Sequence, residues 1–246
     1  MRLSIIIPVL NSHEIVRRQL LHFGKLDLSN DIEIFIMDDG SNPPLDFRHN
    51  IKNLTIYPTN DYRAWTQEIA RNKGAELASG KNLIMVDADY ILTREAIDCA
   101  LEFDGDKMEF RRKFGILDEG GNIKTDKESL KRYGLIKKWI PRKGFEFVPG
   151  HRNNFCMKRE LFLKMGGYKT SGAGKAYPYG GGPDSKFYTK WRVLAKHGRV
   201  SLHDYKPIVY FIPNGKYCGH MDANPFNLFH NLSRKSGNFR SMLCEN

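Results

Sequence analysis

The first hundred residues alternate between short apolar runs and longer amphipathic segments, and this alternation constrains the fold more than any other feature. Leu3–Val9 is a nearly continuous apolar run, as expected of a strand that is covered on both faces. His13–Phe23 follows with apolar residues at helical spacing. Because alternating strands and helices are typical of layered α/β structures with parallel strands, the sequence predicts an α/β fold with a mostly parallel sheet.

The same pattern continues toward residue 90. It predicts strands at Ile32–Met37 and Asn82–Val86, a weaker strand at Leu54–Tyr57, and a helix over Ala64–Ala78 that ends at a Ser-Gly pair. From about residue 101 the chain becomes charge-rich, and Asp118–Asn122 has the composition of a hairpin turn. We expect one domain, with halves at 1–100 and 101–220 and a C-terminal tail at 221–246.

Acidic residues follow two of the predicted strands. Asp38 and Asp39 come after the second strand, and Asp87 and Asp89 come after the last one. In open α/β sheets ligands bind at the carboxyl ends of the strands. Two carboxylates around a small residue supply oxygen ligands for a hard cation such as Mg²⁺ or Mn²⁺. A solvated turn, or a helix cap at Asp89, is the competing interpretation of this pair. For Asp38 we favour turn formation or helix capping.

The charge balance restricts the choice of partners. Lys and Arg number 39 and Asp and Glu number 28, which gives a net charge of +11 and favours anionic partners. Two basic clusters lie in the second half, Arg111–Lys113 and Lys137–Lys138. They form either a solvated face or a binding surface for an anionic acceptor, a lipid diphosphate or a membrane surface. Peripheral membrane association is therefore one of the roles open to the chain.

Cysteine usage and hydropathy indicate the compartment. The four cysteines are scattered and form no C-x-x-C pair, which favours reduced thiols over a disulfide framework. No apolar run approaches the roughly 18 residues of a membrane span, and the N-terminus enters a strand directly, without the pattern of a signal peptide. We expect a cytoplasmic protein.

Four short blocks give the chain a resemblance to a known family. The blocks are Ser4–Asn11, Ile36–Ser41, Ala70–Gly74 and Val86–Asp89. In the order and approximate spacing of these blocks, the chain resembles the inverting, nucleotide-sugar-dependent family 2 glycosyltransferases. A looser likeness continues through Gly150–Glu160 and Gly166–Tyr168. The resemblance implies a GT-A fold, in which a Rossmann-like nucleotide-binding half is fused to an acceptor-binding half with a small antiparallel sheet.

The resemblance also implies a donor site. Pro8 and Val9 would line the nucleotide pocket, Asp39 would accept a hydrogen bond from the base, most often uracil, and Arg71 would lie nearby with Asp87. A carboxylate suits a base N–H donor, and the forked guanidinium suits a phosphate or a carboxylate. A UDP-sugar is therefore the favoured donor. For Arg71, an ion pair or a solvated helix face is the competing interpretation.

A metal site is implied at the same place. Asp87 and Asp89 would hold Mn²⁺ or Mg²⁺, and His220 stands where several relatives supply a third ligand. Imidazole binds Mn²⁺ acceptably, although a lone histidine near a turn is as readily a hydrogen-bonded surface residue. His203 is a weaker candidate.

The catalytic base is implied by a glycine-rich stretch. In the family the base is the Asp of a Glu-Asp pair after such a loop, and the matching stretch here is Gly180–Gly182 followed by Pro183 and Asp184. Asp184 aligns with the base, while proline replaces the glutamate. Asp184 could also cap a helix that starts near Ser185, and the two roles are compatible.

The leading hypothesis is thus an inverting glycosyltransferase that uses a nucleotide-sugar donor and a glycan, lipid-linked or protein-linked acceptor. A sugar-phosphate nucleotidyltransferase is one alternative, although Pro8–His13 lacks the glycine-rich phosphate loop that such an enzyme needs after its first strand. A non-catalytic basic protein that binds polyanions or nucleic acid is the other. No recognisable nucleic-acid-binding motif is present, so we expect no nucleic-acid partner. The oligomeric state stays open.

Overall fold

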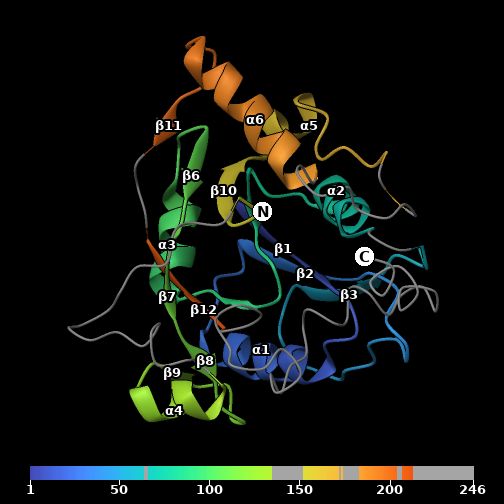
Figure 1. Cartoon of the computed structure of the whole chain (residues 1–246), viewed down its shortest axis with the longest axis vertical. Helices are drawn as coiled ribbons and strands as arrows, with labels where there is room; N and C mark the ends of the chain where they lie inside the picture. Colours follow the sequence, from blue (N-terminus) through green and yellow to red (C-terminus); the bar gives the residue numbers. More distant parts are fainter. Residues whose placement is uncertain (64–65, 135–151, 172, 174–182, 204–206, 213–246) are drawn as a thin grey trace, which may run out of the picture.

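A computed structural model describes residues 1–63, 66–134, 152–171, 173, 183–203 and 207–212 of the chain (Figure 1). Its main sheet has seven strands in the order β11-β6-β10-β4-β1-β2-β3. Several features predicted from sequence lie outside the described residues: Lys137–Lys138, Gly180–Gly182, Cys218, His220, Cys244 and the tail at 221–246.

The N-terminal half builds a parallel sheet around its first strand. β1 (Leu3–Val9) lies between β2 (Ile32–Asp38) and β4 (Asn82–Met85), and β3 (Leu54–Pro58) pairs with β2. All these pairs are parallel. Every residue of β1 is buried, which explains its continuous apolar run. The predicted strands are confirmed to within a residue.

The second half extends the same sheet. β10 (Phe155–Lys158) runs antiparallel to both β4 and β6 (Lys107–Glu109), and β11 (Leu202–His203) is parallel to β6. The strands of the two halves therefore share one sheet, in which β10 alone runs against its neighbours. Because β4 and β6 point the same way, their carboxyl ends meet at the same edge.

Two small sheets flank the main one, and one of them is the expected small antiparallel sheet. β8 (Ile116–Leu117) and β9 (Ile123–Lys124) form the predicted antiparallel hairpin around Asp118–Asn122. The other small sheet is mixed, because β12 (Ile208–Phe211) is antiparallel to β5 (Tyr90–Ile91) but parallel to β7 (Arg111–Phe114). The second half therefore carries the expected small antiparallel sheet together with this mixed one.

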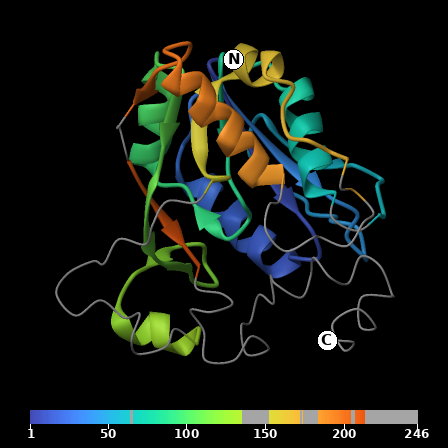
Figure 2. The same cartoon turned by 45° about the horizontal axis from the view of Figure 1, so that its top comes forward.

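Helices cover both faces of the main sheet. They are α1 (His13–Lys25), α2 (Gln67–Leu77), α3 (Arg94–Glu102), α4 (Lys127–Arg132), α5 (Arg159–Lys164) and α6 (Pro183–Lys196). One core joins α1, α3 and the small sheets to the face that carries Ile5 and Ile7. The other joins α2, α5 and α6 to the face that carries Ile6, and Figure 2 shows these three helices together on one side. Because successive side chains of β1 point to opposite faces of the sheet, this strand contributes residues to both cores.

Two further sequence expectations can be compared with the described part of the chain. Cys99 and Cys156 are free thiols there, as expected. No helix in those residues combines the length and apolar character that crossing a membrane requires.

Candidate active site

The acidic segments meet at one edge of the sheet, as the strand pattern predicts. The backbone N–H of Asp39 donates to the carbonyl of Val9 (2.7 Å), and that of Val86 donates to the carbonyl of Ile6 (3.2 Å). The end of β1, with the buried residues Pro8 and Val9, therefore lies between the two acidic segments.

Asp38 builds the turn after β2. Its Oδ1 accepts a hydrogen bond from the backbone of Ser41 and its Oδ2 from that of Leu45, both at 2.9 Å. With both oxygens used and 3% of the residue exposed, Asp38 shapes the loop that holds Asp39. The turn interpretation is confirmed.

Asp39 links β2 to α2. Its Oδ1 accepts a hydrogen bond of 2.8 Å from the hydroxyl of Thr66, the N-cap residue of α2. Both residues are buried. Sequence reasoning missed Thr66 because it began the helix at Ala64, which hid the usual Thr signal at a helix start. The pair fixes the first turn of α2, and with it Arg71, against the sheet edge.

Arg71 and Asp87 form an ion pair between α2 and the end of β4. Arg71 is 1% exposed, whereas 22% of the Asp87 side chain is exposed. Burial alone would lower the pKa of Arg71, but Asp87, Tyr168 and Glu68 together outweigh burial and raise it, so the guanidinium stays protonated. Its Nε and Nη1 are buried and have no hydrogen-bond partner among the residues that the structure describes. The ion-pair interpretation of Arg71 is confirmed, and the cation points at the acidic edge.

The segment around Asp89 is held from two directions. Gln19, a buried residue of α1, donates through Nε2 to the carbonyls of Tyr90 (2.7 Å) and Ala88 (3.3 Å). The carbonyl of Asp89 accepts from the backbone of Ile212 (2.8 Å), directly after β12. Sequence reasoning missed Gln19, since only the fold brings α1 beneath this loop.

Asp89 does not cap the following helix. That role belongs to Thr93, whose hydroxyl accepts a hydrogen bond from the backbone of Ala96 (3.1 Å). The cap interpretation of Asp89 is therefore wrong. The residue is half-buried.

A Gly-Gly-aromatic turn carries Tyr168 into the site. Gly166 and Gly167 both have positive φ, at 77° and 57°, which suits glycine. Asn72 of α2 clamps the turn, because its Oδ1 accepts from the backbone N–H of Tyr168 and its Nδ2 donates to the carbonyl, both at 2.9 Å. The Cζ of Arg71 lies 5.5 Å from the Tyr168 ring centre.

Tyr168 connects the acidic edge to α6. Its ring lies 4.8 Å from that of Phe187, one turn after Asp184. Burial raises the pKa of Tyr168, the charge of Arg71 opposes this, and the charges of Asp87 and Asp184 add to the rise. Asp87 and Asp184 therefore lie near the same side chain although they are far apart in the sequence. Because α6 begins at Pro183, Asp184 stands inside its first turn, and the expectation that it precedes a helix starting near Ser185 is wrong.

The chemistry of the two edge carboxylates suits a divalent cation. Hard oxygen ligands suit Mn²⁺ or Mg²⁺, and both Asp87 and Asp89 are incompletely buried. Within the described ranges, however, no group of three or more His, Cys, Asp or Glu side chains could hold a metal ion. The backbone of His203 lies in β11, which β6 and β10 separate from β4. A cation here would need further ligands from a bound diphosphate, water or His220.

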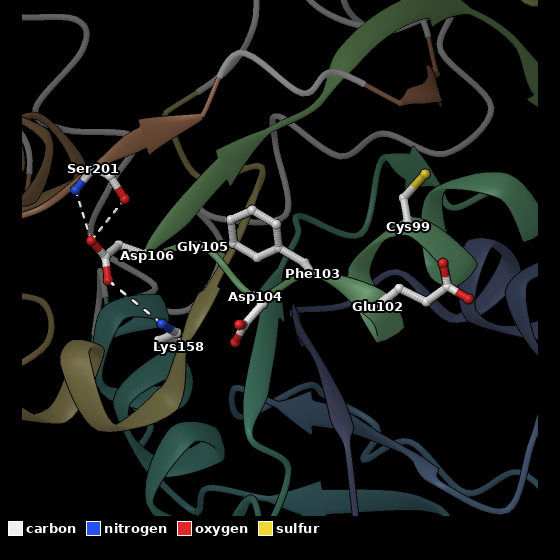
Figure 3. Close-up of a pocket in the computed structure, with 8 residues that line it drawn as sticks. All are labelled: Cys99, Glu102, Phe103, Asp104, Gly105, Asp106, Lys158 and Ser201. Carbon is white, nitrogen blue, oxygen red and sulfur yellow. Dashed lines mark hydrogen bonds and ion pairs between the residues drawn. The ribbon is translucent and has the colours of Figure 1, made fainter.

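A cavity of about 620 Å³ lies at the opposite edge of the sheet. Figure 3 shows one of its acidic residues paired within the lining, since Asp106 accepts hydrogen bonds from the backbone and hydroxyl of Ser201 (2.7 and 2.9 Å) and lies 3.9 Å from Lys158. Lys158 is level with Asn82, at the start of β4. None of the candidate site residues lines this cavity.

Residues 4–108 match the protein family described as Glycosyl transferase family 2. The match includes all the candidate residues of the N-terminal half and excludes Asp184 and His220. No curated protein matches the chain.

Solved structures share the fold at low sequence identity. TarS 1–349 from S. aureus is 18% identical, with a TM-score of 0.54 over 86% of this chain and 60% of its own. The mannosyltransferase PcManGT from Pyrobaculum calidifontis, in complex with GDP-Man and Mn²⁺, is also 18% identical, with a TM-score of 0.55 over 88% of this chain and 58% of its own. TarS 1–349 in complex with UDP-GlcNAc is 16% identical, with a TM-score of 0.50 over 88% and 60%. The chain thus spans about six tenths of these structures, and the GT-A fold is confirmed.

Proposed function

We propose, on the premise that residues 4–108 belong to Glycosyl transferase family 2, that the chain transfers a sugar from a nucleoside-diphosphate sugar to an acceptor hydroxyl with inversion. The observation that carries the proposal is the convergence of Asp87, Arg71 and Asp184 around Tyr168. A donor-side ion pair and an acceptor-side carboxylate thereby face one edge of the sheet. A transferase needs this arrangement, because its leaving group and its base act on opposite sides of the sugar carbon.

The donor would bind across the ends of β1 and β2. Pro8 and Val9 supply an apolar wall, Asp39 accepts from the base, and Arg71 and Asp87 meet the diphosphate side. The unpartnered nitrogens of Arg71 support this assignment, because a phosphate oxygen would satisfy a buried donor that otherwise costs free energy. A UDP-sugar stays the favoured donor, although the related structures hold both UDP-GlcNAc and GDP-Man.

The metal would be held by Asp87 and Asp89, with His220 as a third protein ligand. When bound, Mn²⁺ or Mg²⁺ neutralises charge on the departing diphosphate. The chemistry of the two carboxylates fits this cation, and PcManGT is recorded with Mn²⁺. Gln19 and Ile212 keep the Asp89 segment in place for it.

Asp184 would act as the general base. It takes the proton from the acceptor hydroxyl as the oxygen attacks the anomeric carbon, while the bond to the diphosphate breaks on the other face. The first turn of α6 is fixed by the packing of Phe187 against Phe155 and Tyr168. Pro183 starts this helix. Asp184 therefore has a defined position in the first turn, although proline stands where the family has a glutamate.

We further propose that residues 1–246 act as one catalytic domain in the cytoplasm, with a glycan, lipid-linked or protein-linked acceptor. The shared seven-stranded sheet supports the first point. The scattered, reduced cysteines support the second. Peripheral membrane contact through basic clusters remains part of the proposal.

A donor screen tests the proposal. Ligands that bind the native state raise its melting temperature, so we expect UDP-, GDP- or dTDP-sugars to raise it only when Mn²⁺ is present. Release of the nucleoside diphosphate should follow with the same donor. Pyrophosphate-dependent release of a nucleoside triphosphate would instead indicate a nucleotidyltransferase. Salt-sensitive polyanion binding that survives loss of Asp87 and Asp184 would indicate a non-catalytic binding protein.

A further inference from the structure

Glu109 lies at the same sheet edge as the candidate site. It is the last residue of β6 and is level with Phe155 of β10, which is itself level with Met85 of β4. Asp87 stands two residues beyond Met85. Residues that are level across neighbouring strands place their side chains on the same face, so Glu109 shares the face of Phe155, on which α6 packs.

Lys107 is buried beside Glu109 at an energetic cost. It is 1% exposed, and its Nζ donates to Oε1 of Glu109 at 2.7 Å. The ammonium lies 4.9 Å from the ring centre of Phe155 and 5.7 Å from that of Trp191. Burial lowers the pKa of Lys107, and Glu109 opposes that shift. A buried cation destabilises a fold unless it is paired, and an apolar side chain would fill this position without that cost.

Glu109 itself reaches solvent. Its side chain is 29% exposed, and among the residues that the structure describes only its Oε1 has a hydrogen-bond donor. Oε2 is therefore left for another group. The Lys107 ammonium orients the carboxylate, with one oxygen inward and one at the edge.

The direction of α6 places Glu109 on the acceptor side. Phe187 stacks on Phe155 with ring centres 5.7 Å apart, and Trp191, one turn later, packs over Lys107. The helix therefore begins, with Asp184, toward the edge where β6 ends. Arg71, which pairs with Asp87, lies against the Tyr168 ring.

We propose that Glu109 binds the acceptor and that Lys107 is its positioning residue. Oε2 accepts a hydrogen bond from a second hydroxyl of the acceptor, next to the one that Asp184 deprotonates. The acceptor is then a polyhydroxylated molecule, a carbohydrate, rather than a simple alcohol. This inference rests on the proposed function, because it needs a transfer reaction with an acceptor hydroxyl.

The test uses the full chain, Mn²⁺ and the sugar nucleotide that gives the largest thermal shift. The probes are methyl glucoside, methyl galactoside and methyl mannoside as acceptors, with 1-propanol as a single-hydroxyl comparison, and the readout is release of the nucleoside diphosphate. We expect at least one glycoside to stimulate release and 1-propanol not to do so. Glu109→Gln should raise the KM for that glycoside about tenfold, because one hydrogen bond to a charged group is lost. The KM for the donor should change much less.

Two further variants separate binding from folding. Glu109→Gln leaves Lys107 unpaired, whereas the double variant Lys107→Met/Glu109→Gln removes both charges and should recover the melting temperature. Its glycoside KM should nevertheless stay about tenfold high. Asp104→Asn, which breaks the exposed pair with Lys81 at the opposite edge, should change neither KM.

The outcomes are distinguishable. If no sugar nucleotide shifts the melting temperature or releases its diphosphate, the proposed function fails and this inference fails with it. Three other results would contradict the role of Glu109 and leave the proposed function standing. In the first, release occurs but no glycoside stimulates it. In the others, 1-propanol stimulates release equally, or the double variant keeps the wild-type KM for the glycoside.

Discussion

Arg71 and Asp87 pair across the gap between α2 and the end of β4. The buried guanidinium needs the carboxylate for its own stability, and the carboxylate keeps an exposed part at the sheet edge. The pair thus ties the packing of α2 to the orientation of the residue that we place beside the donor diphosphate.

Replacing Arg71 should therefore affect stability and donor binding together. Arg71→Met leaves Asp87 without its partner, and breaking a largely buried pair costs about 2 to 4 kcal/mol. We expect the free energy of unfolding in urea to fall by this order and the Mn²⁺-dependent affinity for UDP to fall with it. The control is Arg63→Met, which breaks an exposed pair with Asp61 and should change neither quantity measurably. Unchanged UDP affinity in Arg71→Met would remove this residue from the donor site.

Gln19 should be needed for metal binding more than for folding. Gln19→Leu removes two hydrogen bonds to the carbonyls that bracket Asp89, at a cost of about 1 to 3 kcal/mol. Because the Asp89 segment loosens, the Mn²⁺ concentration for half-maximal UDP binding should rise severalfold.

A matched control exists at the other end of β4. Asn82 is also buried and donates to two carbonyls, those of Ala100 (3.0 Å) and Phe103 (2.7 Å). Asn82→Leu should lose comparable stability and keep the wild-type Mn²⁺ requirement. If both variants change the Mn²⁺ requirement equally, the effect is general destabilisation.

His22 should make stability depend on pH. Burial lowers its pKa below the ordinary 6.5, and its Nε2 lies 2.8 Å from the carbonyl of Leu92. The unfolded chain therefore binds a proton more readily than the folded one, so this part of the stability is complete above pH 6.5 and is lost as the pH falls below it. From pH 7.5 to 5.0, wild type should lose more unfolding free energy than His22→Gln, by up to about 1.4 kcal/mol per pH unit. Parallel curves in urea titrations at several pH values would contradict this.

Alanine substitutions at the two glycines of the turn before Tyr168 should differ in their effect on stability. Both have positive φ, but a Cβ on Gly167 would lie 2.5 Å from Oδ1 of Asn72, whereas one on Gly166 would meet nothing within 4 Å. Gly166→Ala should cost about 1 kcal/mol for the backbone conformation alone. Gly167→Ala should cost clearly more in the same denaturation experiment and should weaken UDP binding, because it displaces Tyr168. Equal effects would mean that the Asn72 clamp does not hold the turn.

Much of this edge was predictable because it depends on local pattern. The apolar run of β1, the acidic ends of the next strands and the turn at Asp38 all follow from residue type and spacing. Thr66, Gln19 and Lys107 were not predictable in the same way. Each acts on a residue of another element, and nothing in a helix or strand pattern reveals which polar side chain the fold will bring beneath a loop.

The second half was harder for a related reason. β6 and β12 each pair with strands distant in the sequence, so the mixed sheet and the extension of the main sheet depend on long-range register. The start of α6 was placed two residues late because a proline and an aspartate both suit the beginning of a helix. The role of Asp184 as the base stays a prediction.

The central claim is that Asp184 serves the chemical step while Asp89 serves metal-dependent donor binding. The most direct measurement compares sugar transfer with the Mn²⁺-dependent affinity for UDP in Asp184→Asn and Asp89→Asn. Asp184→Asn should lose about a hundredfold or more of the transfer rate and bind UDP as wild type does, whereas Asp89→Asn should lose both. Equal loss of UDP affinity in the two variants, or undiminished transfer by Asp184→Asn, would contradict the division of roles.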